Sequence, residues 1–235
     1  MAEGVGRALR APASAAVPLE PQVDVQSVRR FVKALDARIS YPAQDAELSG
    51  LVGLVPQFTQ EKAGVQLLRA VTAQRILRAL RTPAVRRVRV AVKAAAPERT
   101  VAQFGPVIVI RRGVNELRYY RGAKLTRTFG VATGQAVYPT PTGIFSIVEM
   151  QLNPWWLPPD SAWAKGEKPI PPGPGNPLGT RWMGLSAPGV GIHGTPDDAS
   201  IGYSASHGCI RMHIPDAEWL FHHVEIGTPV VITNA

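Results

Sequence analysis

The chain has 235 residues, enough for two modest domains, because single domains usually span about 100 to 150 residues. Hydrophobic residues make up 45% of it, and its 22 glycines and 22 prolines predict many turns and stiff loops rather than a helical bundle. The net charge of +9 lies almost wholly in residues 1–100, where 16 basic residues stand against 8 acidic ones. Such a surface suits wall polymers, anionic lipid headgroups or nucleic acid, but no zinc-finger spacing or basic recognition helix supports nucleic acid.

The first 23 residues are rich in alanine and proline and are predicted to be a flexible lead-in. They lack the continuous apolar core of a signal peptide. No stretch of the chain approaches the roughly 18 apolar residues that span a bilayer. If the protein is exported, we therefore expect its signal or membrane anchor to lie outside this chain.

Residues 24–97 are predicted to form a small α+β module. An apolar stripe at helical spacing predicts a helix from Val25, which Tyr41-Pro42 ends because a residue before proline avoids the helical region. Residues 45–60 are expected to be extended around two glycines. A second helix is expected over residues 70–80.

A strand is predicted at residues 88–92, where valines alternate with basic residues in the period of two typical of a half-exposed strand. Residues 94–100 are predicted to be a linker. Residues 104–235 are predicted to form a mainly-β domain, because short apolar segments at 107–110, 117–120 and 125–131 are separated by glycine-containing turns.

Residues 151–182 break this pattern with eight prolines and four tryptophans, the last of them Trp182. A long irregular segment inside a compact domain is usually functional or disordered. Because disordered segments rarely carry so many tryptophans, we expect an ordered lid or cleft wall.

Cys209 is the only cysteine, which excludes an intramolecular disulfide and makes the thiol a candidate nucleophile. A free thiol has a pKa near ~8.5 and needs a base to become reactive at neutral pH. Of the nearby histidines, we predict that His193 is the base, reaching across from a neighbouring strand with the Gly194 backbone orienting its ring. His207, two positions before the cysteine, is expected to help through its backbone.

The residues around the cysteine suggest further roles. Gly208 lets the chain bend sharply, so the amides of Gly208 and Cys209, with His207, are candidates for an oxyanion hole. Arg211 is expected to favour the thiolate or to hold a substrate carboxylate. His213, His222 and His223 are interpreted as packing or surface residues, the last two on a short helix.

Two alternatives remain open from the residues alone. A lone cysteine is most often simply a buried apolar residue. His193, His207 and Cys209 together with Asp197 or Asp198 also offer zinc ligands, although a structural zinc site usually has more thiolates.

Taken together, these residues resemble a known catalytic motif. His193-Gly194 followed by the run SHGCIRM, residues 206–212, is similar to the signature of the L,D-transpeptidase (YkuD) family. The resemblance extends over residues 105 to 233 and includes VATG at 131–134, TPTGIF at 140–145 and NPLG at 176–179. One departure is Arg211, where many members carry asparagine; it bears on substrate detail rather than on activity.

The resemblance implies a β-rich, sandwich-like fold and a reaction on peptidoglycan. It implies that Cys209 is the nucleophile and His193 the proton donor and acceptor, while Ser206, His207 and Gly208 shape the cleft. Arg211, Gly194 and Trp182 are the expected substrate-binding residues. The expected reaction forms 3→3 cross-links through a Cys209 thioester with tetrapeptide stems, without metal or organic cofactor, and carbapenems are expected to acylate the same cysteine.

The expected partners are peptidoglycan stem peptides and anionic wall polymers, in an extracytoplasmic location, with no nucleic acid and no membrane contact except through an anchor absent from this chain. Residues 24–97 resemble, more weakly, a peptidoglycan-binding module that often precedes these catalytic domains. Two alternatives to the transpeptidase remain: an L,D-carboxypeptidase of the same fold, which uses water as acceptor, and a non-catalytic wall-binding protein.

Overall fold

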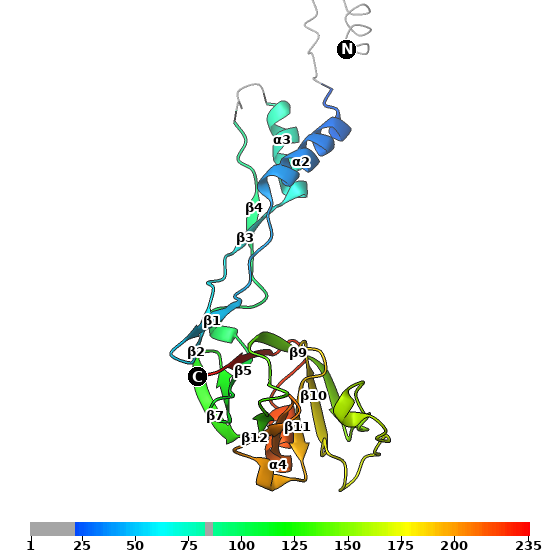
Figure 1. Cartoon of the computed structure of the whole chain (residues 1–235). Coiled ribbons are helices and arrows are strands. Elements are labelled where there is room, and N and C mark those ends of the chain that lie inside the picture. The colour runs from blue at the N-terminus through cyan, green and yellow to red at the C-terminus, as the bar shows by residue number, and fades with distance from the viewer. Residues whose placement is uncertain (1–21, 83–86) are drawn as a thin grey trace, which may run out of the picture. The chain divides into compact units, whose positions relative to one another are not determined.

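The computed structural model describes residues 22–82 and 87–235 (Figure 1). Contacts divide the chain into two compact units: unit 1 comprises Met1–Asp45 and Glu61–Glu98, and unit 2 comprises Ala46–Gln60 and Arg99–Ala235. The predicted lead-in lies almost wholly outside the described residues. Residues 46–60, predicted from the sequence to belong to the first module, have their contacts in unit 2.

Unit 1 is built from two helices and a two-stranded antiparallel sheet. Helix α2, Val25–Ile39, starts where the Asp24 carboxylate accepts a hydrogen bond from the Gln26 amide and so caps the helix. Helix α3 is Arg69–Leu80, and strand β3, Gly64–Leu67, pairs with β4, Val92–Ala95. Apolar side chains from both helices and from β3 form its core: Val28, Val32 and Leu67, with Val23, Leu35, Ile39, Ala73, Ile76 and Leu77 around them.

The strand predicted at residues 88–92 is wrong in position, because β4 begins only at Val92. The physical reason is the partner strand. Val92 pairs with Leu67, and directly after Leu67 the chain enters α3, so no neighbouring strand extends the ladder toward Val88. The linker predicted from residue 94 likewise starts too early, since Ala94 and Ala95 belong to β4.

Unit 2 contains one mixed eight-stranded sheet in the order β13-β11-β10-β9-β14-β5-β6-β7. Its strands are β5 Pro106–Arg111, β6 Glu116–Arg121, β7 Lys124–Gly130, β9 Gly143–Leu152, β10 Arg181–Leu185, β11 Gly191–Thr195, β13 Ile210–His213 and β14 Pro229–Thr233. Most neighbours are antiparallel, but β11–β13 and β14–β5 are parallel. The sequence-based prediction of a mainly-β domain after a small α+β module is confirmed.

Alternation along β5 shows how the sheet buries both faces. Ile108 and Ile110 enter the main core of unit 2, whereas Val107 and Val109 face a second cluster. That cluster is covered by the hairpin of β1, Leu48–Val52, and β2, Val55–Phe58. The hairpin therefore packs on the back of the sheet.

The remaining elements are short. Helix α4, Ile214–Phe221, follows β13 directly, contacts β10, β11 and β13, and buries Ala217 and Leu220 in the main core. Strands β8, Thr133–Gly134, and β12, Ser204–Ser206, form a parallel pair. The 3₁₀ helices are η1 Val101–Gln103, η2 Ala162–Ala164 and η3 Asp198–Ser200. Among the described residues, no helix has both the length and the apolar character to cross a bilayer.

Candidate active site

His193 lies in β11, between β10 and β13, and is almost completely buried. Its Nδ1 is 2.6 Å from the Gly194 carbonyl oxygen. A carbonyl can only accept a hydrogen bond, so Nδ1 carries the proton and Nε2 keeps its lone pair. Burial lowers the pKa of His193 to about 4; the bond to Gly194 opposes this shift and the positive charge of Arg211 adds to it.

Cys209 directly precedes β13, which runs parallel to β11 with Ile192 beside Ile210 and His193 beside Arg211. Ile192 and Ile210 are fully buried in the main core. Because side chains alternate along a strand, His193 and Arg211 project from the opposite face. The Cys209 sulfur lies against the start of β11, 3.5 Å from the Gly189 carbonyl oxygen.

The thiol and the imidazole are both neutral at rest. Burial raises the pKa of Cys209. The hydrogen bond from the Gly191 amide and the positive charge of Arg211 favour the thiolate and oppose this rise. With the pKa of His193 near 4, neither group is charged at neutral pH. The arrangement therefore suits a proton transfer that accompanies nucleophilic attack rather than a preformed thiolate–imidazolium pair.

The turn before the cysteine is fixed by two hydroxyl groups. Ser206 Oγ accepts a hydrogen bond from the Gly208 amide at 3.1 Å and donates one to the Cys209 carbonyl at 2.5 Å. Thr140 Oγ1 donates to the Gly208 carbonyl at 2.9 Å and accepts from the Gly134 amide at 2.8 Å. Gly208 has φ +112°, a conformation that side chains other than hydrogen rarely allow.

These hydrogen bonds change one sequence-based expectation. The Gly208 amide was a candidate oxyanion donor, but in this structure it is already bound to Ser206. The amides of His207 and Cys209 remain the candidates that the sequence proposed. The Ser206 hydroxyl is thus bound at both its donor and its acceptor side within the turn.

His207 is held in an aromatic stack. Its ring lies 4.1 Å from that of Trp163, with 14° between the planes, and 5.0 Å from that of Tyr138. Partial burial lowers the pKa of His207, and the Arg211 charge lowers it further. Trp163 belongs to η2 in the proline-rich segment, so this stack ties that segment to the turn that carries Cys209.

The Trp182 ring lies beside the His193 ring. The two residues are paired across β10 and β11, and their ring centroids are 5.9 Å apart. The indole Nε1 donates to the Glu149 carboxylate at 3.1 Å. The ring also lies over Gly191, where an added Cβ would come within 2.3 Å of it, so only glycine leaves room for this tryptophan.

Arg211 projects from β13 and forms an ion pair with Asp197 at 3.6 Å. Its positive charge lowers the pKa of His193, of His207 and of Cys209.

The proline-rich segment is ordered around one buried side chain. Asn176 donates to the carbonyls of Pro154, Ile170 and Pro171 and accepts from the Leu178 amide. The backbones of Trp156 and Ile170 also exchange hydrogen bonds. These hydrogen bonds join residues near both ends of the segment.

The zinc alternative gains no support from the geometry. Among the described residues, no three His, Cys, Asp or Glu side chains are grouped as metal ligands. Asp197 pairs with Arg211 instead, and Asp198 is bound to His213 at 2.6 Å.

Sequence reasoning missed several contributors. Tyr138 and Glu149 contact site residues that are distant in the chain, and nothing local marks them. Thr140 lies in the TPTGIF segment, so the resemblance offered a signal without assigning a role. Trp163 stood out only as one of several tryptophans.

Comparison with known proteins identifies the family. Residues 105–232 match the model of the L,D-transpeptidase catalytic domain, YkuD. The chain belongs to this family. YqjB of Bacillus subtilis, whose name assigns it to the L,D-transpeptidases, is 37% identical over 135 residues, which are 55% of this chain and 72% of that protein. YkuD of Bacillus subtilis, named for the same activity, is 35% identical over 127 residues, covering 54% of this chain and 65% of that protein.

A solved structure supports the fold independently. L,D-transpeptidase 3 from Mycobacterium tuberculosis superposes with a TM-score of 0.50 at 14% identity, over 91% of this chain and 90% of that one. At this identity the likeness concerns the fold alone, and here it spans both units.

Proposed function

We propose that this protein is a peptidoglycan L,D-transpeptidase that forms 3→3 cross-links between tetrapeptide stems, with Cys209 as nucleophile and His193 as proton donor and acceptor. One observation carries the proposal. The Gly194 carbonyl holds His193 in the tautomer whose Nε2 can take a proton. The Cys209 sulfur lies against the start of β11, the strand that carries His193.

In the first step, the sulfur attacks the carbonyl carbon of the third stem residue, a diamino acid followed by D-alanine. His193 Nε2 takes the thiol proton as the carbon–sulfur bond forms, and the oxyanion is held by the amides of His207 and Cys209. When the intermediate collapses, the bond to D-alanine breaks and His193 returns the proton to the leaving amine. The product is a thioester on Cys209.

In the second step, the side-chain amine of another stem attacks the thioester. His193 takes a proton from this amine, the carbon–sulfur bond breaks, and the proton returns to sulfur. The new amide joins the third residues of two stems and the thiol is regenerated. No metal or organic cofactor enters this balance.

The surrounding residues suit this reaction. The Trp182 ring lies next to His193, and Arg211 is placed to attract a stem carboxylate in competition with Asp197. The proline-rich segment reaches the site through Trp163 and is proposed to limit access of water to the thioester. This role would distinguish the transpeptidase from a carboxypeptidase.

The proposal extends to partners and location. An enzyme acting on peptidoglycan works outside the cytoplasm, at the wall. Residues 24–45 and 61–97 of unit 1, with their excess of basic side chains, are proposed as a wall-binding module, with anionic wall polymers as further partners.

The test is incubation of the chain with disaccharide-tetrapeptide, followed by mass spectrometry of the products, with Cys209→Ala as control. The proposal expects cross-linked dimer plus free D-alanine from the wild type only. Tripeptide and D-alanine without dimer would assign the carboxypeptidase reaction instead. If folded wild-type protein gives neither product, the non-catalytic wall-binding alternative takes precedence.

A further inference from the structure

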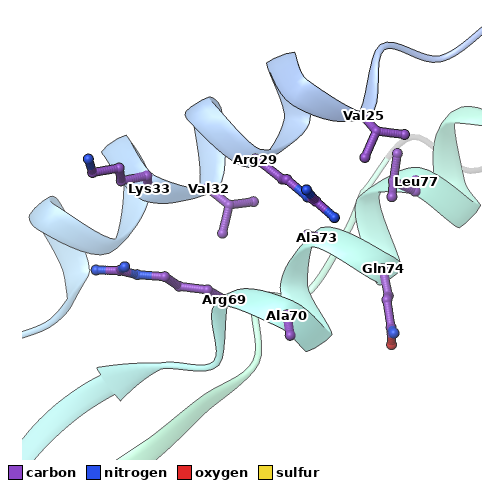
Figure 2. Close-up of a pocket in the computed structure, with 9 residues that line it drawn as sticks. All are labelled: Val25, Arg29, Val32, Lys33, Arg69, Ala70, Ala73, Gln74 and Leu77. Carbon is purple, nitrogen blue, oxygen red and sulfur yellow. The ribbon is translucent and has the colours of Figure 1, made fainter.

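A groove between α2 and α3 in unit 1 has a volume of about 460 Å³, within the range of small-ligand sites (Figure 2). Its lining combines two kinds of side chain. Val25, Val32, Ala70, Ala73 and Leu77 are apolar, whereas Arg29, Lys33, Arg69 and Gln74 are basic or polar.

Two of the cations are available to a ligand. Arg29 and Lys33 are exposed and stand one turn apart on α2, and Figure 2 shows Arg29 reaching across toward Ala73 of α3. Within the described part of the chain, neither forms an ion pair. Arg69, in contrast, is bound to Asp36.

The two helices carry an excess of positive charge. Together they contain seven basic residues and a single acidic residue, Asp36, which is occupied by Arg69 and Ser40. The charge complement of this surface is therefore an anion. The apolar lining requires that the ligand also has an apolar part, because a fully hydrophilic polyanion would leave this lining in contact with water.

Apolar exposure extends past one end of the groove. Val25 lies beside Leu77 in Figure 2 and is 37% exposed, and Leu80, three positions farther along α3, is 52% exposed. A short soluble ligand within the groove would not cover Leu80, whereas a lipid surface would. Basic side chains beside exposed apolar ones are typical of helices that lie on membranes.

We propose that the α2–α3 groove binds an anionic phospholipid, with the phosphate at Arg29 and an acyl chain along Val32, Ala73 and Leu77. Lys33, which points away from Arg29 in Figure 2, adds positive charge on the other side of the groove. The site attaches unit 1 to an anionic membrane surface. It does not depend on the reaction at Cys209.

The test is cosedimentation of the full chain with vesicles of phosphatidylglycerol and phosphatidylcholine, compared with phosphatidylcholine alone. Binding is expected only to the anionic vesicles. Arg29→Gln with Lys33→Gln should weaken vesicle binding about 30-fold, because each basic side chain near an anionic lipid surface contributes roughly fivefold to the affinity. Arg30→Gln with Arg38→Gln removes the same charge from α2 outside the groove and should cost about threefold or less, since such charges are screened at physiological salt.

A second pair of variants tests the groove itself. Ala70→Glu places an acid on its exposed lining and should weaken binding at least about tenfold, as an acid facing a phosphate repels it. Ala37→Glu, exposed on α2 outside the groove, should have little effect.

Three results would overturn the proposal: equal binding to neutral vesicles, equal losses in the groove and control variants, or binding of soluble polyphosphate without binding of vesicles. Acylation of Cys209 by a carbapenem, measured in the same preparations, reports on unit 2 and keeps failure of the lipid site separate from failure of the proposed enzyme.

Discussion

In unit 2 the candidate reactive groups are partly or wholly buried, neutral at rest and fixed by hydrogen bonds, whereas in unit 1 the groove is lined by exposed cations. His193 and the turn before Cys209 are held by a carbonyl and two hydroxyl groups, and Arg29 and Lys33 extend from one helix face. The difference suggests that reaction chemistry needs positions fixed by long-range contacts, while attachment to a charged surface needs only charge and apolar area. Substitutions in the two units should therefore have unlike effects.

Replacing the base should have the largest effect among the neighbours of Cys209. His193→Asn removes the group that takes the thiol proton, and we expect acylation by a carbapenem to slow about 10²- to 10⁴-fold. Stopped-flow absorbance of the β-lactam measures this rate. As a control, His213→Asn removes a histidine of β13 that is bound to Asp198 and should leave the rate within about threefold. Equal slowing in both variants would contradict the assignment of His193.

Gly191→Ala should disturb the site through packing. The added methyl group meets the Trp182 ring at 2.3 Å, so the indole must leave its place beside His193 and its bond to Glu149. We expect roughly tenfold to 100-fold slower acylation and about 1–3 kcal/mol lower stability, measured by urea unfolding. Gly105→Ala, in open space, is the matched control. A Gly191→Ala variant indistinguishable from that control would show that the position of the Trp182 ring does not affect acylation or stability.

Acid should weaken unit 2 through His193. Its pKa is about 4 when folded and near 6.5 when unfolded, so between these values the unfolded chain binds a proton that the folded chain does not. The stabilisation is complete above pH 6.5 and is lost as the pH falls toward 4, up to about 3 kcal/mol. Urea unfolding from pH 7.5 to 4.5 should show that the wild type loses more stability than His193→Asn. Parallel curves for the two proteins would mean that the buried histidine titrates normally.

Ser206→Ala should act through the turn. It leaves the Gly208 amide without its acceptor, and we expect a loss of about 1–3 kcal/mol. Because the freed amide can then turn toward substrate, we expect acylation to fall by less than about tenfold. Ser206→Thr keeps the hydroxyl and should recover most of the stability. If the alanine variant is as stable as the wild type, the two hydrogen bonds do not hold the turn.

The smallest effect on acylation is expected from unit 1. Arg29→Gln with Lys33→Gln changes exposed side chains that lie in the other unit, so the carbapenem rate should stay within about twofold of the wild-type value. A much larger change in the stopped-flow rate would show that the two units are coupled. It would contradict the assignment of reaction chemistry to unit 2 and of surface attachment to unit 1.

The sequence predicted most of what depends on local pattern. Apolar spacing predicted the first helix of unit 1, and a segment rich in alanine, leucine and arginine predicted the second. Short apolar segments between glycine-containing turns predicted the first strands of unit 2. His193-Gly194 and the run SHGCIRM made His193 and Cys209 the candidate reactive pair. The strand at residues 88–92 was misplaced because its length depends on where β3 ends, and that is decided by the start of α3.

Long-range contacts account for what the sequence could not give. The Gly208 amide was expected to face substrate, but the Ser206 hydroxyl turns back to bind it. Glu149 is 33 positions before Trp182 in the chain, and it contacts the site only because its strand, β9, pairs with β10. Side-chain direction in a turn and pairing across a sheet are set by the whole fold, and one sequence carries no local mark of them.

The most direct test of the central claim is intact-protein mass spectrometry after mixing the full chain with a carbapenem, in parallel with Cys209→Ala. We expect one adduct per chain on the wild type and none on the variant. A wild-type protein that is folded, by circular dichroism, yet gains no mass, or an adduct that persists in Cys209→Ala, would contradict the assignment of Cys209 as the acylated nucleophile.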